Sequence, residues 1–206
     1  MTDKYINFAD LAANEVLNVD YRISFRQPAG AAVAHIAIHG GAIEPAATQL
    51  ADSAANMGSY AYYSFEGIKS SGNGFLHITS THFDEPNAIV LVGGLARTIS
   101  WHGASGTTPQ TYVGGRDATL KSKVIDQLVA AGFTVAPDTP PELNANDPLN
   151  ITNKNSSHMG VQLELTKAQR EQFFTNGQLN RTWIENPANR TPVFAQYVTA
   201  VNNALA

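Results

Sequence analysis

The run of apolar residues from Ala31 to Ile38 (AAVAHIAI) constrains the fold of this chain more than any other feature. Strands that are buried on both faces show such unbroken apolar runs, whereas a strand with one solvated face alternates. The run ends at His39-Gly40-Gly41, and paired glycines are typical of a tight turn. We therefore expect a central strand that is covered on both faces and stops at this turn.

Strand patterns and helix patterns alternate along the rest of the chain. Apolar runs predict further strands at residues 60–65, 76–79, 97–101, 133–136 and 161–165. Helical spacing and terminal residues predict helices at 45–58, 86–92, 117–131, 167–174 and 192–205. This alternation predicts an α/β fold in three layers around a mixed, largely parallel central sheet. The length of 206 residues suits a single domain over residues 1–206.

Composition excludes several classes of protein. With 43% hydrophobic and 15% charged residues, the chain carries too much apolar material for a disordered protein. A formal net charge of -4 provides no basic field for phosphate backbones, so we expect no nucleic-acid partner. The chain has no cysteine, which excludes disulfides, thiolate metal sites and cysteine nucleophiles.

Signals for export or membrane insertion are missing from the sequence. No stretch approaches the ~20 apolar residues of a membrane span, and the N-terminal segment has no apolar run of signal-peptide length. We expect synthesis in the cytoplasm, no membrane partner and a monomeric chain. Action outside the cell after release by lysis is compatible with this expectation.

An imidazole and a carboxylate lie five positions apart directly after the apolar strand, at His39 and Glu44. Sites of α/β sheets lie beyond the carboxyl ends of strands, and a turn at the glycines can swing Glu44 back toward His39. His102 follows another predicted strand and can complete a set typical of catalytic zinc, with one position open for water. The His-Gly-Gly sequence can equally be a plain turn. His35, inside the apolar run, is predicted to be a core histidine.

Gln162 and Glu164 share one face of the predicted strand at 161–165, whose other face is apolar. One interpretation makes Glu164 the general base that accepts a proton from a zinc-bound water. The other makes this segment an edge strand with a solvated face.

Two further segments carry polar side chains. His77 and His82 lie among hydroxyl residues, where they can hold a polar substrate; alternatively, His77 packs in the core and Asp84 caps the next helix. The segment from 137 to 158 is rich in Pro, Asn and Asp and shows no periodicity. An ordered loop of that length is usually functional, so we expect it to border the active site.

Five motifs occur in order along the chain: HGGAIE at 39–44, SGNGFLHITSTHFDEP at 71–86, SWHG at 100–103, VGGRD at 113–117 and GVQLELTKAQR at 160–170. Together they resemble the phage-type poly-γ-glutamate hydrolases, small zinc peptidases whose fold is similar to that of zinc carboxypeptidases. The likeness spans nearly the whole chain.

The resemblance implies one zinc ion per chain on His39, Glu44 and His102, with Glu164 as the base or proton shuttle. It also implies cleavage of γ-glutamyl amide bonds in poly-γ-glutamate, a polymer of bacterial capsules that shields host cells from phage. Four residues separate His39 from Glu44, where the larger carboxypeptidase group has two. The carboxypeptidase arginine that grips a free carboxylate has no match by motif, so exopeptidase specificity stays unassigned.

A polymer with one carboxylate per residue calls for cations near the cleft, although the chain is acidic overall. Arg116 and Arg170 follow predicted site elements and are the candidates for substrate contact, together with His82 and Gln162. Each arginine could instead be an ordinary exposed residue.

Two other functions stay open from the sequence. The same zinc chemistry could act on a cell-wall peptide or an N-acyl amino acid. The fold could also serve as a phage or bacterial interaction module without catalysis.

Overall fold

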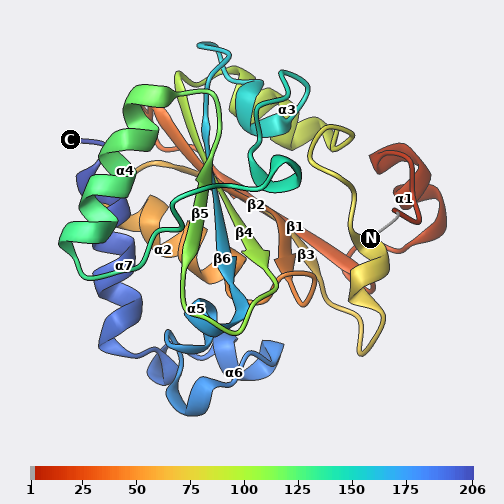
Figure 1. The fold of residues 1–206 in the computed structure, drawn as a ribbon. Coiled ribbons are helices and arrows are strands. Elements are labelled where there is room, and N and C mark those ends of the chain that lie inside the picture. Colours follow the sequence, from red (N-terminus) through yellow and green to blue (C-terminus); the bar gives the residue numbers. More distant parts are fainter. Residues whose placement is uncertain (1–2) are drawn as a thin grey trace.

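Six strands form one sheet in the computed structural model, which describes residues 3–206 (Figure 1). The strands are β1 (Tyr21–Arg26), β2 (Val33–Gly41), β3 (Ala61–Gly67), β4 (Arg97–Ala104), β5 (Thr111–Gly114) and β6 (Val161–Thr166). The helices are α1 (Phe8–Asn14), α2 (Ala47–Gly58), α3 (Pro86–Gly93), α4 (Ala118–Ala130), α5 (Lys167–Glu171), α6 (Arg181–Glu185) and α7 (Pro192–Asn203). Short 3-10 turns, among them η1 (Asn73–Leu76) and η3 (Ile151–Asn153), lie in the connections.

The sheet is parallel in its centre and antiparallel at both edges. Its strand order is β1-β3-β2-β4-β6-β5. Strands β3, β2, β4 and β6 run parallel, whereas β1 pairs antiparallel with β3 and β5 pairs antiparallel with β6. The predicted mixed, largely parallel sheet is therefore confirmed. The carboxyl ends of the four parallel strands meet at one end of the sheet, which is where α/β proteins place their ligand sites.

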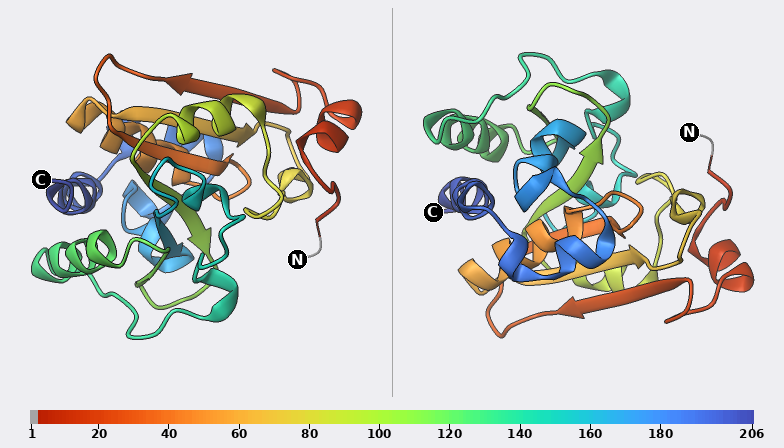
Figure 2. Two further views of the ribbon diagram at one scale, coloured as in Figure 1. Left: turned by 90° about the horizontal axis from the view of Figure 1, so that it is seen from above. Right: turned by 90° about the horizontal axis from the view of Figure 1, so that it is seen from below.

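Apolar clusters cover both faces of the sheet. On one face, α2, α4 and α7 contribute Leu50, Val124 and Val201 to a buried cluster. Figures 1 and 2 show α4 and α7 side by side along this face. On the other face, Leu11 of α1 and Leu91 of α3 belong to a second cluster. The predicted three-layer α/β architecture is confirmed by this arrangement.

Side-chain caps begin several of the predicted helices. Asp117 accepts a hydrogen bond from the Leu120 amide at the start of α4, at 2.9 Å, and Glu85 accepts one from the Ala88 amide at the start of α3, also at 2.9 Å. Such caps satisfy amides that have no partner inside the helix. Asp84, which the sequence offered as an alternative cap of α3, does not cap it, because its carboxylate instead accepts from the Phe8 amide.

Two predicted strands are not strands in the structure. In the segment at 76–79, Leu76 ends η1 and the remaining residues form a loop, because their backbone groups bond side chains: the Thr79 amide donates to Asp3 at 2.6 Å and the Ile78 carbonyl faces His39 at 2.9 Å. The segment at 133–136 forms only an isolated bridge, between Thr111 and Val135. Conversely, the sequence analysis predicted neither edge strand, β1 or β5.

Strands β2 and β4 pair only over their first halves. Their register ends at Ile36 and Ser100, although both strands continue. Against β3, the register of β2 shifts between Ala37 and Gly40, which marks a β-bulge. A bulge bends its strand and re-aims side chains. His39, in the bulge, and the later part of β4 therefore lie where the sheet opens between its two middle strands.

No helix in the part of the chain that the structure describes, residues 3–206, combines the length and apolar character needed to span a membrane.

Candidate metal centre

The turn after β2 folds Glu44 back onto His39. The Glu44 amide donates to the His39 carbonyl at 2.9 Å, and the Ile43 amide donates to the Gly40 carbonyl at 3.3 Å. Gly41 has φ +63°, in the left-handed region that glycine adopts readily. A Cβ on Gly40 would lie 2.2 Å from Thr48 Oγ1, so this position also requires glycine for space.

Three side chains converge at this turn. His39 Nδ1 lies 3.0 Å from Glu44 Oε1 and 3.1 Å from His102 Nδ1. His102 Nδ1 lies 3.2 Å from Glu44 Oε2. Both histidines are 2% exposed, so these polar atoms depend on one another rather than on bulk water. The structure thus brings together the three residues that the sequence analysis selected as ligands.

Hydrogen bonds on the far side of each ring leave the Nδ1 atoms facing the carboxylate. His39 Nε2 lies 2.9 Å from the Ile78 carbonyl, which can only accept, so Nε2 carries the proton and Nδ1 of the neutral ring carries a lone pair. His102 Nε2 bonds Ser100 Oγ at 2.8 Å. Ligating histidines are held in this way, with the second ring nitrogen bonded to a carbonyl or another polar group.

Electrostatics couple the three groups. Burial raises the pKa of Glu44, but electrostatic attraction and hydrogen bonds from the imidazoles of His39 and His102 together outweigh burial and hold it well below its ordinary value. Burial lowers the pKa of His102, but the Glu44 carboxylate outweighs that effect and raises it overall. A buried carboxylate of this kind requires positive charge beside it, whether a proton or a cation.

The donor set fits a zinc ion. Zinc binds histidine nitrogen and carboxylate oxygen at ~2.0–2.2 Å in tetrahedral geometry, which places ligand atoms about 3.3–3.6 Å apart. Here the two Nδ1 atoms are 3.1 Å apart, and the Glu44 carboxylate lies 3.0 Å from His39 Nδ1 through Oε1 and 3.2 Å from His102 Nδ1 through Oε2, each slightly less than these values. Two nitrogens and one carboxylate oxygen are also the donors of catalytic zinc sites.

His77 offers an alternative third ligand, which the sequence analysis did not consider. Its ring stacks on that of His39 with 3.9 Å between centroids, and ligand atoms of His39, Glu44 and His77 all lie within 4.8 Å of one another. Its Nδ1 bonds Asp3 Oδ1 at 2.7 Å. Because the nitrogen of His102 lies within 3.2 Å of both other donors, the distances favour His102 and leave His77 beside the set.

Glu164 lies next to the three donors on the neighbouring strand. It pairs in register with His102, and its side chain is buried. Burial, assisted by the charge of Glu44, raises the pKa of Glu164 to about 7. Its Oε1 accepts a hydrogen bond from Gln162 Nε2 at 2.9 Å. A carboxyl group with a pKa near neutrality is suited to accept and return a proton.

Gln162 is committed to holding Glu164 rather than free to bind a substrate. The Thr152 amide donates to Asn150 Oδ1 at 2.9 Å, so Asn150 Nδ2 faces Gln162 Oε1, at 3.1 Å. This leaves the NH2 group of Gln162 for Glu164. The predicted loop at 137–158 therefore reaches the site through Asn150, a residue the sequence analysis missed because one asparagine in an Asn-rich loop carries no signal.

Arg170, predicted to contact substrate, is buried and its guanidinium nitrogens are occupied. Nε donates to the Leu165 carbonyl at 3.1 Å, Nη1 to the Pro45 carbonyl at 2.8 Å and Nη2 to the Ala104 carbonyl at 3.0 Å. Substrate contact does not fit this arrangement, since all three nitrogens already bond the backbone.

Arg116, the second predicted cation, lies at the opposite end of the sheet. Because β5 runs antiparallel to β6, the end of β5 lies beside the beginning of β6. Just after β5, the Asp117 amide donates to the Gly160 carbonyl at 3.1 Å. Gly160 precedes Glu164 by four residues, about 13 Å of strand. The structure therefore does not bring the exposed Arg116 to the three donors.

His82, the remaining predicted substrate contact, is exposed, and its amide donates to the Thr79 carbonyl at 2.7 Å. It lies on the same connection as His77, but no contact joins its side chain to the donor set in residues 3–206.

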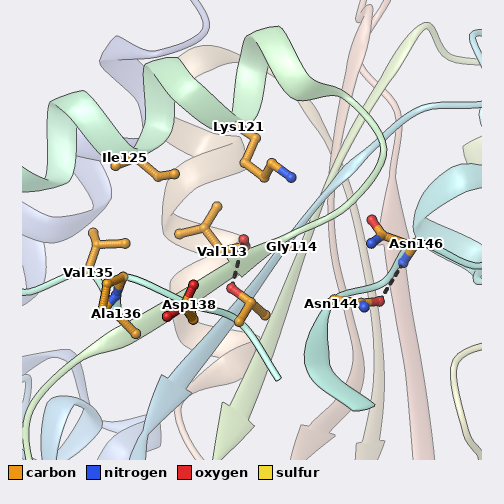
Figure 3. Close-up of a pocket in the computed structure, with 11 residues that line it drawn as sticks. Val113, Gly114, Lys121, Ile125, Val135, Ala136, Asp138, Asn144 and Asn146 are labelled. Carbon is orange, nitrogen blue, oxygen red and sulfur yellow. Dashed lines mark hydrogen bonds between the residues drawn. The ribbon is translucent and has the colours of Figure 1, made fainter. Parts of the chain in front are cut away.

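A pocket of about 310 Å³ lies between α4, β5 and the segment after residue 134 (Figure 3). Lys121 and Asp138 are the charged residues of its lining. None of the predicted site residues lines this pocket, so it is separate from the candidate metal centre.

Comparison with known proteins identifies relatives of the whole chain. The family model described as poly-gamma-glutamate hydrolase matches residues 5–200. A solved bacteriophage poly-gamma-glutamate hydrolase superposes with a TM-score of 0.93 at 33% identity, covering 99% of this chain and 97% of that chain. A zinc-free apo structure of YNDL gives a TM-score of 0.89 at 32% identity, covering 99% of this chain and 98% of that chain.

Proteins of Bacillus subtilis (strain 168) are also similar. The SPbeta prophage-derived UPF0714 protein YoqZ is 39% identical over 201 residues, covering 89% of this chain and 68% of YoqZ. The UPF0714 protein YndL is 37% identical over 173 residues, covering 84% of this chain and 67% of YndL. On the strength of a family match over residues 5–200 and these likenesses, the chain belongs to the poly-gamma-glutamate hydrolase family.

Proposed function

We propose that residues 1–206 form a single zinc-hydrolase domain that cleaves the γ-glutamyl amide bonds of poly-γ-glutamate. The observation that carries this proposal is the convergence of His39 Nδ1, His102 Nδ1 and the Glu44 carboxylate beside Glu164. One zinc ion per chain would be held by His39, Glu44 and His102. The zinc-free form in which the relative YNDL was solved supports zinc as the metal.

The residues divide the chemistry between them. When bound, zinc supplies Lewis acidity that polarises the scissile carbonyl and lowers the pKa of water. Glu164 accepts the proton of the attacking water and then returns it to the leaving amine nitrogen, as general base and then general acid. Gln162 holds the Glu164 carboxylate for both transfers, and Ser100 holds the His102 ring.

The substrate follows from the family and from the solved phage enzyme, whose name gives poly-γ-glutamate as its substrate. Hydrolysis of this capsule polymer would open the surface of an encapsulated bacterium to a phage. With Arg116 remote and Arg170 occupied, neither arginine explains how the polymer's carboxylates are bound. His77 and His82, on the connection beside the donors, stay candidates for that contact.

A comparison of two histidine variants tests the ligand set. His102→Ala is expected to lose nearly all zinc from the purified protein, because it removes a donor within 3.2 Å of both others. His77→Ala, the matched control, is expected to retain about one zinc per chain. Zinc content by elemental analysis measures both. Full occupancy in His102→Ala with loss in His77→Ala would make His77 the third ligand.

The substrate is tested by offering the wild-type protein poly-γ-glutamate, poly-α-glutamate and a cell-wall peptide, each with and without a chelator. We expect chelator-sensitive cleavage of the γ-linked polymer only. Preference for the cell-wall peptide would identify a zinc amidase of another substrate class. Zinc binding without any hydrolysis would favour an interaction module.

A further inference from the structure

The proposed catalytic residues lie on three segments, of which the sheet holds only two together at their ends. Glu44 follows β2, His102 lies near the end of β4 and Glu164 lies near the end of β6. Pairing between β4 and β6 continues to Ala104, but pairing between β2 and β4 ends at Ser100, before His102. The backbone ladder therefore does not set the position of the Glu44 turn relative to β4.

One guanidinium spans this gap. Arg170 lies in α5, directly after β6, and is 6% exposed. It donates to the carbonyl of Pro45, the residue after Glu44, at 2.8 Å. It also donates to the carbonyl of Leu165, the residue after Glu164, at 3.1 Å. Its third acceptor is the carbonyl of Ala104, two residues after His102, at 3.0 Å.

Gly103 shows how closely the guanidinium is seated. A Cβ on Gly103 would lie 2.5 Å from Cζ and 2.6 Å from Nη1 of Arg170. The φ of Gly103 is not in the left-handed region, so a Cβ here would displace the guanidinium without straining the backbone. On its other side, the Gly103 amide donates to Glu44 Oε2 at 2.9 Å. Gly103 thus lies between the proposed ligand Glu44 and the arginine.

The geometry of the contact is specific to arginine. The guanidinium is planar and rigid, so three bonds from three of its nitrogens fix the three carbonyls relative to one another. A lysine ammonium is a single point and cannot span the same acceptors. Burial lowers the pKa of Arg170, while the charges of Glu44, Glu164 and Glu171 oppose that effect.

We propose that Arg170 is a positioning residue that locks the segments bearing Glu44, His102 and Glu164 to one another. This inference rests on the proposed function for what the three residues do. It assigns Arg170 to the site without assigning it any contact with substrate.

The first experiment compares Arg170→Met and Arg170→Lys with Arg181→Met, a control on α6 whose partner is the nearby Glu185. Zinc affinity is measured by competition with a chelator, and kcat and KM are measured on a small γ-glutamyl amide. We expect both Arg170 variants to lose zinc affinity and kcat by about 10–100-fold, as when partners of metal ligands are removed, with KM changed less than about twofold. Arg181→Met is expected to match the wild type.

Two results would overturn the assignment. Wild-type zinc affinity in Arg170→Met would show that the three segments keep their places without the guanidinium. A rise in KM at constant kcat and constant zinc affinity would assign Arg170 to substrate contact. Wild-type protein that binds no zinc would instead refute the proposed function, a result that the variants do not influence.

A second experiment tests the contact even if Arg170→Met folds poorly. Gly103→Ala keeps the arginine but forces it away from the carbonyls, so it is expected to lower zinc affinity, whereas Gly93→Ala, with nothing nearer than 3.9 Å to its Cβ, is the control. In the Arg170→Lys background, Gly103→Ala is expected to add little, because the guanidinium is gone. Unfolding of the metal-free proteins is measured in the same cycle. Additive losses in both measurements would contradict the proposal.

Discussion

Two histidines of β2 lie four residues apart and have opposite environments. His35 is fully buried on the face covered by α2 and α7, where its Nδ1 accepts from Trp101 Nε1 at 3.1 Å. His39 lies on the other face, against Glu44 and His102. Strand alternation would put two residues at an even offset on the same face. The bulge between Ala37 and Gly40 interrupts the alternation, so His39 lies on the opposite face from His35.

The comparison shows that the neighbours of an imidazole, not its place in a sequence pattern, decide its chemistry. Burial alone lowers the pKa of His35 to about 3, so it is a neutral core residue at neutral pH, as predicted. His39 is equally hidden from solvent, yet it faces a carboxylate and a second imidazole, with which it forms the candidate metal centre. The following variants separate the two roles, beginning with the largest expected effect.

His39→Ala is expected to abolish zinc retention and hydrolysis, because it removes one of three proposed ligands. His35→Leu, its partner in the comparison, is expected to retain about one zinc per chain. Elemental analysis of both purified proteins measures the difference. Equal zinc loss in both variants would mean that the two histidines act together and that the bulge does not separate their roles.

Glu164→Gln is expected to reduce kcat by ~10²–10⁴-fold while zinc content and fold are preserved, because the amide keeps the shape of the side chain but cannot accept the proton. Steady-state kinetics on a γ-glutamyl amide, with circular dichroism as the check on folding, measure this. If turnover stayed near the wild-type value, Glu164 would be a structural residue.

Asn150→Ala is expected to reduce kcat by about tenfold, the lower end of what removal of a supporting partner costs, because Gln162 loses the contact that orients its amide. Asn150→Asp should be more harmful, since its carboxylate would attract the NH2 group of Gln162 away from Glu164. Asn146→Ala, in the same loop but exposed, is the control. A higher kcat for Asn150→Asp than for Asn150→Ala would contradict the proposed orientation of the Gln162 amide.

His35→Leu is expected to affect stability in a pH-dependent way. At pH 7 the variant should be less stable by about 1–3 kcal/mol, because the buried Trp101 Nε1–H loses its acceptor. The pKa of His35 is about 3 in the folded state and about 6.5 in the unfolded state. Between these values, His35 binds a proton in the unfolded wild type but not in the folded form. Wild-type stability therefore falls as pH drops from 6.5 toward 3.

Urea unfolding of metal-free wild type and His35→Leu at pH 7 and pH 5 measures this effect. The difference in unfolding free energy between wild type and variant should shrink by about 2 kcal/mol between pH 7 and pH 5. This value follows because each pH unit below 6.5 costs the wild type about 1.36 kcal/mol. An advantage that stayed constant or grew on acidification would mean that His35 is protonated in the folded state.

Arg116→Ala is expected to have the smallest effect, with zinc content and hydrolysis of a small γ-glutamyl amide both unchanged within about twofold. Its side chain lies at the opposite end of the sheet from the donors. Assays on long poly-γ-glutamate at low and high salt complete the test. A salt-sensitive loss on the polymer alone would mean that bound polymer extends across the molecule to this end.

Local patterns in the sequence predicted the layers and the place of the site. The apolar run at 31–38 is β2, and the helices predicted around α2, α3, α4 and α7 are present within a few residues. The turn at His39-Gly40-Gly41 brings Glu44 back to His39, because the paired glycines leave room for the close approach of the chain. The glycine pair can be recognised in the sequence. Selection of Glu164 likewise needed only strand alternation and the family resemblance.

For the other side chains at or near the site, only the tertiary structure decided where each one lies and which groups it contacts. The antiparallel direction of β5 carries Arg116 away from the site, and the fold encloses Arg170 among carbonyls up to 125 residues distant along the chain. Asn150 and His77 enter the site from connections without periodicity. Periodicity reports the local conformation of a segment, whereas strand direction, register and burial of a charge depend on contacts between distant residues. For that reason the sequence determined the fold class and proposed the ligands, and the folded chain determined their supporting contacts.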